Sequence, residues 1–257
     1  MQNFKTQWRS WRALLDKLVA NSGGGYLICP DERQLQVKTL NETITVTLPH
    51  PICFYGIPQK QRSVRSSKRG KLMVVFIDGS FCFDANNTSV LCDISSCVSF
   101  YLISGDENKR LLTLADAYHF DFFKEDVNGA SPHPMFHAQR DIRLEDMLPR
   151  FKNALTQGGR NSKGEIYEPD QEEINKIFGL GSFRIPTPQL DVLNLGAAIA
   201  ANQLVSSDDL PQWMILKSLL THTKTSNELF AVRTPPNHNA QMFTQPRNHL
   251  PDWYSTR

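Results

Sequence analysis

The N-terminal segment carries apolar side chains at the spacing of an amphipathic helix. Large apolar residues recur every three or four positions, at Trp8, Trp11, Leu15, Leu18 and Val19. A stripe of this kind is the side of a helix that packs against a core. The glycine run 23–25 then ends the pattern, because successive glycines favour a helix end. We therefore predict a helix over about residues 4–20, with both tryptophans in the core.

After the glycines the pattern changes to short runs typical of β-strands. Residues 43–48 alternate polar and apolar side chains, as a half-buried strand does. Longer runs, separated by turn-forming residues, are expected as four successive strands at Leu72–Phe83, Val90–Ser104, Arg110–Phe123 and Met135–Ile142. Short links between consecutive strands favour antiparallel pairing of neighbours. The sequence therefore predicts an antiparallel β meander.

Helical spacing returns after residue 143. Four segments are expected as helices, at Leu144–Leu155, Glu172–Phe178, Gln189–Val205 and Asp209–Thr221. Thr187, which lies between two prolines, is the expected N-cap of the third helix. Residues 234–257 are rich in proline, asparagine and glutamine, and we expect them to form an extended tail.

These elements together predict a single α+β domain over residues 1–233. Its β-rich part covers residues 26–143 and its helical part covers residues 144–233. Hydrophobic residues make up 40% of the 257, which is enough to bury a core of that size. We expect an N-terminal helix, then the antiparallel meander, then C-terminal helices packed on the sheet.

Composition and charge exclude several classes of protein. The formal net charge is +2, which gives no overall attraction to nucleic acid or to a membrane surface. No apolar run reaches the roughly 18–20 residues of a membrane-spanning helix, and residues 1–21 lack the apolar core of a signal peptide. The five cysteines form no CxxC pair, so neither a disulfide framework nor a zinc knuckle is expected. We expect a cytoplasmic protein with no membrane partner.

Residues 60–71 are a local exception to this charge balance. They carry six positive charges and no acid, so they could grip phosphates along a nucleic-acid backbone. The candidate nucleic-acid contacts are Arg65, Lys68, Arg69 and Lys71. The segment holds no aromatic residue that would stack on bases. A solvated loop without a ligand is the alternative interpretation.

Two histidine-containing segments are the strongest candidates for chemistry, YHFDF (118–122) and HPMFHAQ (133–139). Alternate side chains of a strand point to opposite faces. In the first segment His119 and Asp121 therefore share one face, and in the second His137 and Gln139 do. If the two strands pair as a hairpin, the polar faces coincide, with His133 at the turn.

This cluster has three interpretations. Zinc and iron sites combine histidine with carboxylate ligands, so the cluster could ligate a divalent metal through His119, Asp121, His133 and His137. Alternatively, His119 and His137 could act as catalytic general base and general acid, as in an RNA-cleaving site. Asp121 would then orient one ring, and Arg140 or Arg184 would stabilise the charged transition state. The third interpretation is a polar sheet surface without chemistry, since any half-buried strand alternates polar and apolar residues.

The order of three segments resembles a pattern in uncharacterised prokaryotic proteins. In that pattern an HP-x-x-H strand precedes an R-I-P entry into a helix; the matching segments here are YHFDF (118–122), HPMFHAQ (133–139) and RIPTPQLD (184–191). Some proteins with this pattern are encoded among antiviral defence or toxin-like genes. The resemblance implies a bacterial, defence-like setting and assigns no catalytic residue. This chain has Gln139 where the pattern tends to place a further histidine or a similar polar group.

Two functions from different classes follow. The first is a non-enzymatic protein-binding subunit of a cytosolic bacterial, defence-like multiprotein assembly, which contacts its partners through the tail at 234–257. The second is a nuclease or phosphodiester-cleaving effector, which uses the His/Asp cluster and holds its substrate with the loop at 60–71. We favour the first, because the chain lacks a complete catalytic signature. The sequence specifies no cofactor, and a nucleic-acid-binding module without chemistry is a third alternative.

Overall fold

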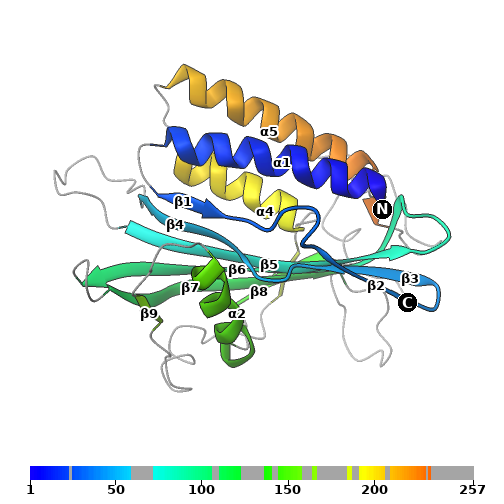
Figure 1. Ribbon diagram of the computed structural model, residues 1–257, viewed down its shortest axis with the longest axis horizontal. Helices are drawn as coiled ribbons and strands as arrows, with labels where there is room; N and C mark the ends of the chain where they lie inside the picture. The colour runs from blue at the N-terminus through cyan, green and yellow to red at the C-terminus, as the bar shows by residue number, and fades with distance from the viewer. Residues whose placement is uncertain are drawn as a thin grey trace.

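The computed structural model is a large, mostly antiparallel sheet with helices on both faces (Figure 1). The residues that it describes are 1–22, 25–58, 72–105, 110–122, 136–140, 144–157, 164–166, 184–186, 191–205, 209–229 and 231–232. The predicted α+β class is confirmed: an N-terminal helix is followed by an antiparallel sheet and by C-terminal helices packed on it.

The central strands follow one another as the predicted meander does. The strands are β1 (Tyr26–Ile28), β2 (Gln36–Leu40), β3 (Thr43–Thr47), β4 (Ile52–Pro58), β5 (Leu72–Asp84), β6 (Val90–Gly105), β7 (Arg110–Phe122), β8 (Phe136–Gln139), β9 (Gly164–Ile166), β10 (Arg184–Pro186) and β11 (Ala231–Val232). Their order across the sheet is β1-β4-β5-β6-β7-β8-β10, and β3 pairs with β5 and carries β2 on its other side. β9 and β11 join β7 and β6 in parallel, which the periodicity of the sequence did not predict.

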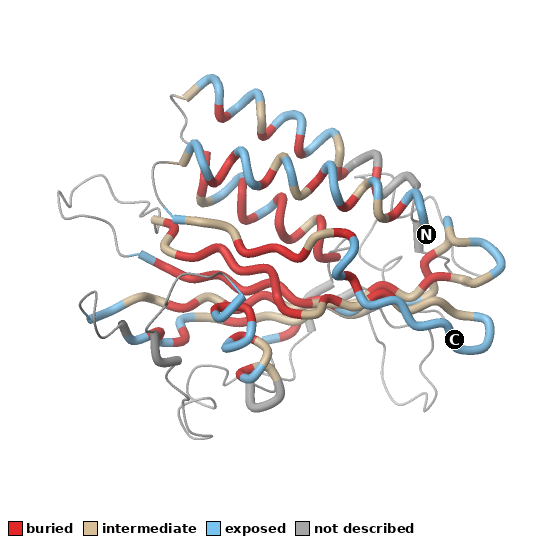
Figure 2. The backbone as a smooth tube through the Cα atoms, in the orientation of Figure 1, coloured by how far each residue is buried: buried red, intermediate tan, exposed pale blue. Residues whose placement is uncertain are grey.

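Helices on the two faces of the sheet create two hydrophobic cores. The helices are α1 (Gln2–Asn21), α2 (Leu144–Gln157), α4 (Val192–Ile199), the π-helical turn η1 (Ala200–Leu204) and α5 (Leu210–Leu229). α1 and α4 lie on one face with α5 packed on them, and α2 lies on the other (Figure 1); we call these the α1 face and the α2 face. Because strand residues alternate, β5 sends Val75 and Ile77 into the first core and Val74 and Phe76 into the second. Figure 2 shows these buried strands between the two helical layers.

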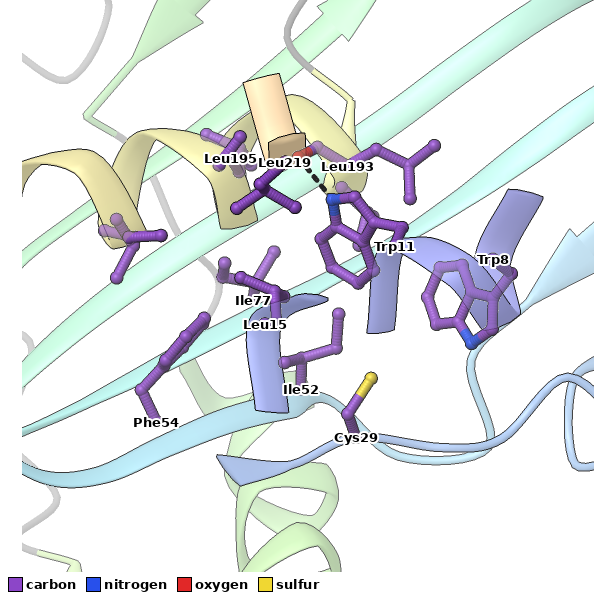
Figure 3. Close-up of a cluster of buried hydrophobic side chains, with 14 of the residues drawn as sticks. Trp8, Trp11, Leu15, Cys29, Ile52, Phe54, Ile77, Leu193, Leu195 and Leu219 are labelled. Carbon is purple, nitrogen blue, oxygen red and sulfur yellow. Dashed lines mark hydrogen bonds between the residues drawn. The ribbon is translucent and has the colours of Figure 1, made fainter. Parts of the chain in front are cut away.

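Both tryptophans of α1 are fully buried, as the sequence predicts. The indole N–H of Trp8 donates to the carbonyl oxygen of Pro30 at 2.8 Å. The indole N–H of Trp11 donates to the carbonyl oxygen of Leu193 at 3.2 Å (Figure 3). A buried N–H without a partner is destabilising, so these two bonds fix the positions of the loop after β1 and the start of α4. The N-terminal helix is thereby joined to the C-terminal half of the chain.

The N-cap of α4 differs from the prediction. α4 begins at Val192, and its N-cap is Asp191, whose carboxylate accepts the backbone N–H of Asn194 at 2.9 Å. A capping side chain must stand directly before the first helical residue, so the prediction of Thr187 as the cap is wrong. Thr187 itself lies outside the described residues, as do the predicted helix at 172–178 and the tail at 234–257.

α5 continues to Leu229, beyond the predicted end at Thr221. The additional turns are bonded to α1: Nε2 of His222 lies 2.9 Å from the carbonyl oxygen of Gln7, and the Ser226 hydroxyl lies 3.3 Å from the side-chain oxygen of Gln7. Tertiary hydrogen bonds of this kind extend a helix where its apolar stripe has ended. Of the helices described, none combines the length and the apolar composition needed to cross a membrane.

Gly196 allows α4 to approach α1 closely, and its replacement tests this packing. A Cβ atom at residue 196 would lie 2.3 Å from Cζ2 of Trp11, far inside contact distance. Overpacking of a core costs about 1–3 kcal/mol, whereas alanine is ordinarily the better helix former by about 1 kcal/mol. We expect the clash to dominate, so that Gly196→Ala lowers the free energy of unfolding by about 1–3 kcal/mol in urea titrations.

The matched control for this substitution is Ala198→Ser, at an exposed position of the same helix. It should change the free energy of unfolding by no more than about 0.5 kcal/mol. A Gly196→Ala protein that is more stable than the wild type would contradict the packing of α4 against Trp11.

Candidate functional site

The two histidine-containing strands pair as the sequence predicts. β7 and β8 are antiparallel neighbours, and in their register Asp121 is opposite His137 and His119 is opposite Gln139. Because strand residues alternate and Phe120 packs against the first core, His119 and Asp121 lie on the α2 face. The structure describes His137 by its backbone position alone, and His133 lies outside the described residues.

Asp121 is the centre of a small hydrogen-bonded group. Its Oδ2 lies 3.1 Å from Nε2 of His119, and its Oδ1 accepts the Ser95 hydroxyl at 3.1 Å. The side chains of His119 and Asp121 are 22% and 37% exposed, so water reaches both. In a Ser–His–Asp triad the imidazole stands between serine and carboxylate and removes the serine proton. Here the carboxylate stands between the other two, so this geometry does not activate Ser95 as a nucleophile.

The group belongs to a row of polar residues whose backbone positions cross the sheet. Successive registers place residues from neighbouring strands side by side: Gln36, Thr47, Ser80, Ser95, Asp121 and His137. α2 covers the α2 face beside the second core, whose residues are apolar. The polar row therefore marks where the apolar contacts of that face end.

An ion pair between a buried aspartate and a half-buried arginine borders this row and was missed by sequence reasoning. Arg150 of α2 donates from Nε to Oδ2 of Asp78 at 2.5 Å and from Nη2 to Oδ1 at 3.0 Å. The same Nη2 donates to the carbonyl oxygen of Leu48 at 2.8 Å. The hydrogen bonds to Asp78 raise the pKa of Arg150 above its ordinary value. No short motif links residues 72 positions apart, so only the fold brings them together.

Cys97 lies between Asp78 and His119 in the register of the sheet. Burial, and secondly the nearby Asp78 carboxylate, raises the pKa of the Cys97 thiol to about 12. The thiolate is the nucleophilic form of cysteine, and at neutral pH Cys97 is therefore a protonated, unreactive thiol. Its position beside His119 does not make a cysteine–histidine nucleophile.

Arg140 does not supply the cation that the acid–base interpretation needs. Its guanidinium forms two hydrogen bonds with Asp116, at 3.1 Å and 2.9 Å, and lies 5.5 Å from the centroid of the Tyr118 ring. The Tyr118 hydroxyl also donates to Asp116, at 2.7 Å. Tyr118 packs against the first core, so this group lies on the α1 face, opposite His119. For Arg184 the structure gives the backbone position, opposite Gln139.

The charged residues beside the polar row are mostly acidic, so they would repel a phosphate backbone. Among the described strand residues on this part of the α2 face, the acids are Asp84, Asp93 and Asp121 and the lysine is Lys38. Binding of nucleic acid relies on cations that displace its counterions. This excess of acids therefore disfavours nucleic acid on the described part of the face.

The predicted metal site and the predicted nucleic-acid contacts stay untested, because some or all of their residues lie outside the described part of the chain. Within the described part of the chain, no three or more histidine, cysteine, aspartate or glutamate side chains are grouped as a metal site requires. Two members of the predicted set, His133 and the His137 side chain, lie outside that part. The four predicted nucleic-acid contacts also lie outside it, at Arg65, Lys68, Arg69 and Lys71.

Comparison with known proteins gives no family model, no curated protein and no solved structure that matches this chain.

The ion pair of Asp78 and Arg150 should stabilise the fold, and a double-mutant cycle measures by how much. The Asp78 side chain is 6% exposed and that of Arg150 is 38% exposed. Removal of one partner leaves a buried charge uncompensated, but water screens a partly exposed arginine. We therefore expect Arg150→Ala to lower the free energy of unfolding by roughly 1–3 kcal/mol.

In the same cycle, Asp78→Ala combined with Arg150→Ala should lose less stability than the sum of the single variants. Lys17→Ala, at an exposed position of α1, is the control; its effect should stay within about 0.5 kcal/mol. Strict additivity of Asp78→Ala and Arg150→Ala would contradict the coupling.

Proposed function

We propose that this chain is a non-enzymatic protein-binding subunit and that the outer side of α5 is its docking surface. The observation that carries the proposal is the exposure of large apolar side chains on this helix. The side chains, with their exposed fractions, are Leu210 (71%), Trp213 (47%), Met214 (65%) and Leu220 (45%). We call these four residues the α5 stripe.

The fold does not need the α5 stripe. Other positions of α5, among them Leu216 and Leu219, are buried in the first core and hold the helix in place. Scattered exposed apolar residues are ordinary, but a contiguous group on one helix marks a contact surface. Tryptophan and methionine are also enriched where proteins bind one another, and tryptophan is a frequent hot spot. These features support a protein partner over a small ligand.

The charge on α5 indicates what kind of partner fits. Lys217 is exposed between the members of the α5 stripe, and none of the described side chains of α5 is acidic. A second copy that paired through α5 would therefore bring no described carboxylate to Lys217. We commit to a different protein, one that presents an apolar helix with an acidic residue opposite Lys217. Such a contact combines burial of the stripe with charge complementarity.

The setting that we propose is a cytosolic bacterial, defence-like multiprotein assembly. The resemblance of the segments at 118–122, 133–139 and 184–191 to proteins encoded among antiviral defence genes supports this setting. The tail at 234–257 remains a proposed second contact. It follows β11, which begins two residues after the end of α5, and lies outside the described residues.

Substitutions in the α5 stripe should remove binding and spare the fold. We expect Trp213→Ala to weaken the affinity for the partner by at least about tenfold, because a buried tryptophan at an interface is typically worth more than 1 kcal/mol. Met214→Ala should act in the same direction. The partner is first identified by affinity purification from the host with mass spectrometry, and affinities are then measured by calorimetry with purified proteins.

The matched control is Ser218→Ala, an exposed polar position of α5, which should leave the affinity unchanged. All three variants should keep the wild-type free energy of unfolding within about 0.5 kcal/mol, since exposed positions contribute little. If Trp213→Ala and Met214→Ala both bind the partner as the wild type does, α5 is not the docking surface.

The second candidate function is cleavage of phosphodiesters, and the opposition of Asp121 to His137 in the sheet favours it. The test is incubation of the full chain with RNA and with DNA, each with and without Mg²⁺ or Mn²⁺. We expect no cleavage, and we expect His119→Ala and His137→Ala to change stability or assembly alone. Cleavage by the wild type that both well-folded alanine variants lose would establish the second function in place of the first.

A further inference from the structure

A different surface lies at an edge of the sheet, on β2. All five residues of β2 are exposed, and β2 pairs with β3 alone. β1 is also an edge strand, but it is shorter and its residues are half-buried or buried. An exposed edge strand presents a row of backbone N–H and C=O groups that can accept another strand. Among the edge strands whose exposure the structure describes, β2 is the one where these groups are accessible.

The hairpin that carries β2 is held in one conformation. Leu40 and Thr43 are the last pair before a two-residue turn, and Asn41 in that turn has a positive φ of 51°. Asparagine is one of the few residues that tolerates this conformation in a tight hairpin. The Thr43 hydroxyl donates to the carbonyl oxygen of Leu40 at 3.0 Å, and β3 is paired with β5 along its whole length. The outer edge of β2 is therefore pre-organised.

Each edge of a strand can pair with one neighbouring strand, and β3 pairs with the inner edge of β2. The outer backbone groups of residues 36–40 have no partner among the described residues. In water these groups are solvated, so their pairing with a new strand gains little by itself. Side-chain pairs across the two strands must supply the specificity.

The side chains of β2 specify which strand fits. Val37, which is 43% exposed, is opposite Val46 and lies on the α1 face. Lys38 lies on the α2 face between Gln36 and Leu40, and Leu40 is 60% exposed. An incoming segment with an apolar residue beside Val37 and an acid beside Lys38 would make favourable pairs on both faces.

A second copy of this chain is the less suitable occupant. Antiparallel pairing of two β2 strands about their centre would place Lys38 opposite Lys38, and like charges directly opposed are destabilising. Lysine on an edge strand is a known means by which proteins prevent pairing with themselves. We infer that β2 binds an extended segment of another protein, with alternating apolar and acidic residues, as an added strand of the sheet. This inference does not depend on the α5 stripe.

To test the binding of an added strand at β2, a short capped peptide of alternating valine and glutamate is titrated into the ¹⁵N-labelled full chain. We expect saturable shifts of the backbone amide signals of residues 36–40. The matched peptide of valine and lysine should bind about tenfold more weakly, because it replaces an attractive pair with a repulsive one. Lys38→Glu should reverse the order of the two peptides.

Lys217→Glu, on α5, should leave both titrations unchanged, which separates this surface from the α5 stripe. Two outcomes would overturn the inference. One is the absence of shifts at residues 36–40 with millimolar valine–glutamate peptide. The other is a shift of the same signals with protein concentration alone, which would show that β2 pairs with a second copy.

Discussion

The burial of two tryptophans on the first helix is the constraint on which the rest of the structure depends. Trp8 and Trp11 fill the space between the sheet and the C-terminal helices, and their indole N–H groups bond to the backbone at Pro30 and Leu193. Gly196 is needed because a larger residue would overlap Trp11. α5 is then held on α1 by hydrogen bonds to Gln7. The contacts of α1 thus hold α5 in place and leave its outer side facing the solvent.

Local periodicity predicted the parts of the fold that depend on neighbouring residues. The stripe containing Trp8 and Trp11 predicted α1, and the short links between strands predicted the antiparallel pairing of the strand of His119 with that of His137. Periodicity could not find the bond between Asp78 and Arg150, which joins a strand to a helix on the α2 face. Nor could it find the cap of α4, because the prolines beside Thr187 suggested an earlier helix start than Asp191 gives.

For the candidate site, the sequence predicted the pairing of the two strands but only part of the hydrogen bonding among their side chains. The register places Asp121 opposite His137, but Asp121 stands between Ser95 and His119, and Arg140 is bonded to Asp116 on the other face. The sign of a charge and the face of a strand can be read from sequence, whereas the order of groups in a hydrogen-bonded cluster cannot. The sequence also could not predict that Trp213 and Met214 are exposed, because a buried and an exposed apolar stripe have the same helical spacing.

We propose that this protein binds a partner through α5 and does not act by chemistry at the His/Asp cluster. The most direct test is hydrogen–deuterium exchange of the full chain, alone and in complex with the protein that co-purifies with it. We predict that the complex slows exchange of the α5 backbone around residues 210–220 and leaves β7 and β8 unchanged. Slower exchange at residues 119–121 and 136–139, with α5 unaffected, would contradict the account and identify the histidine strands as the functional surface.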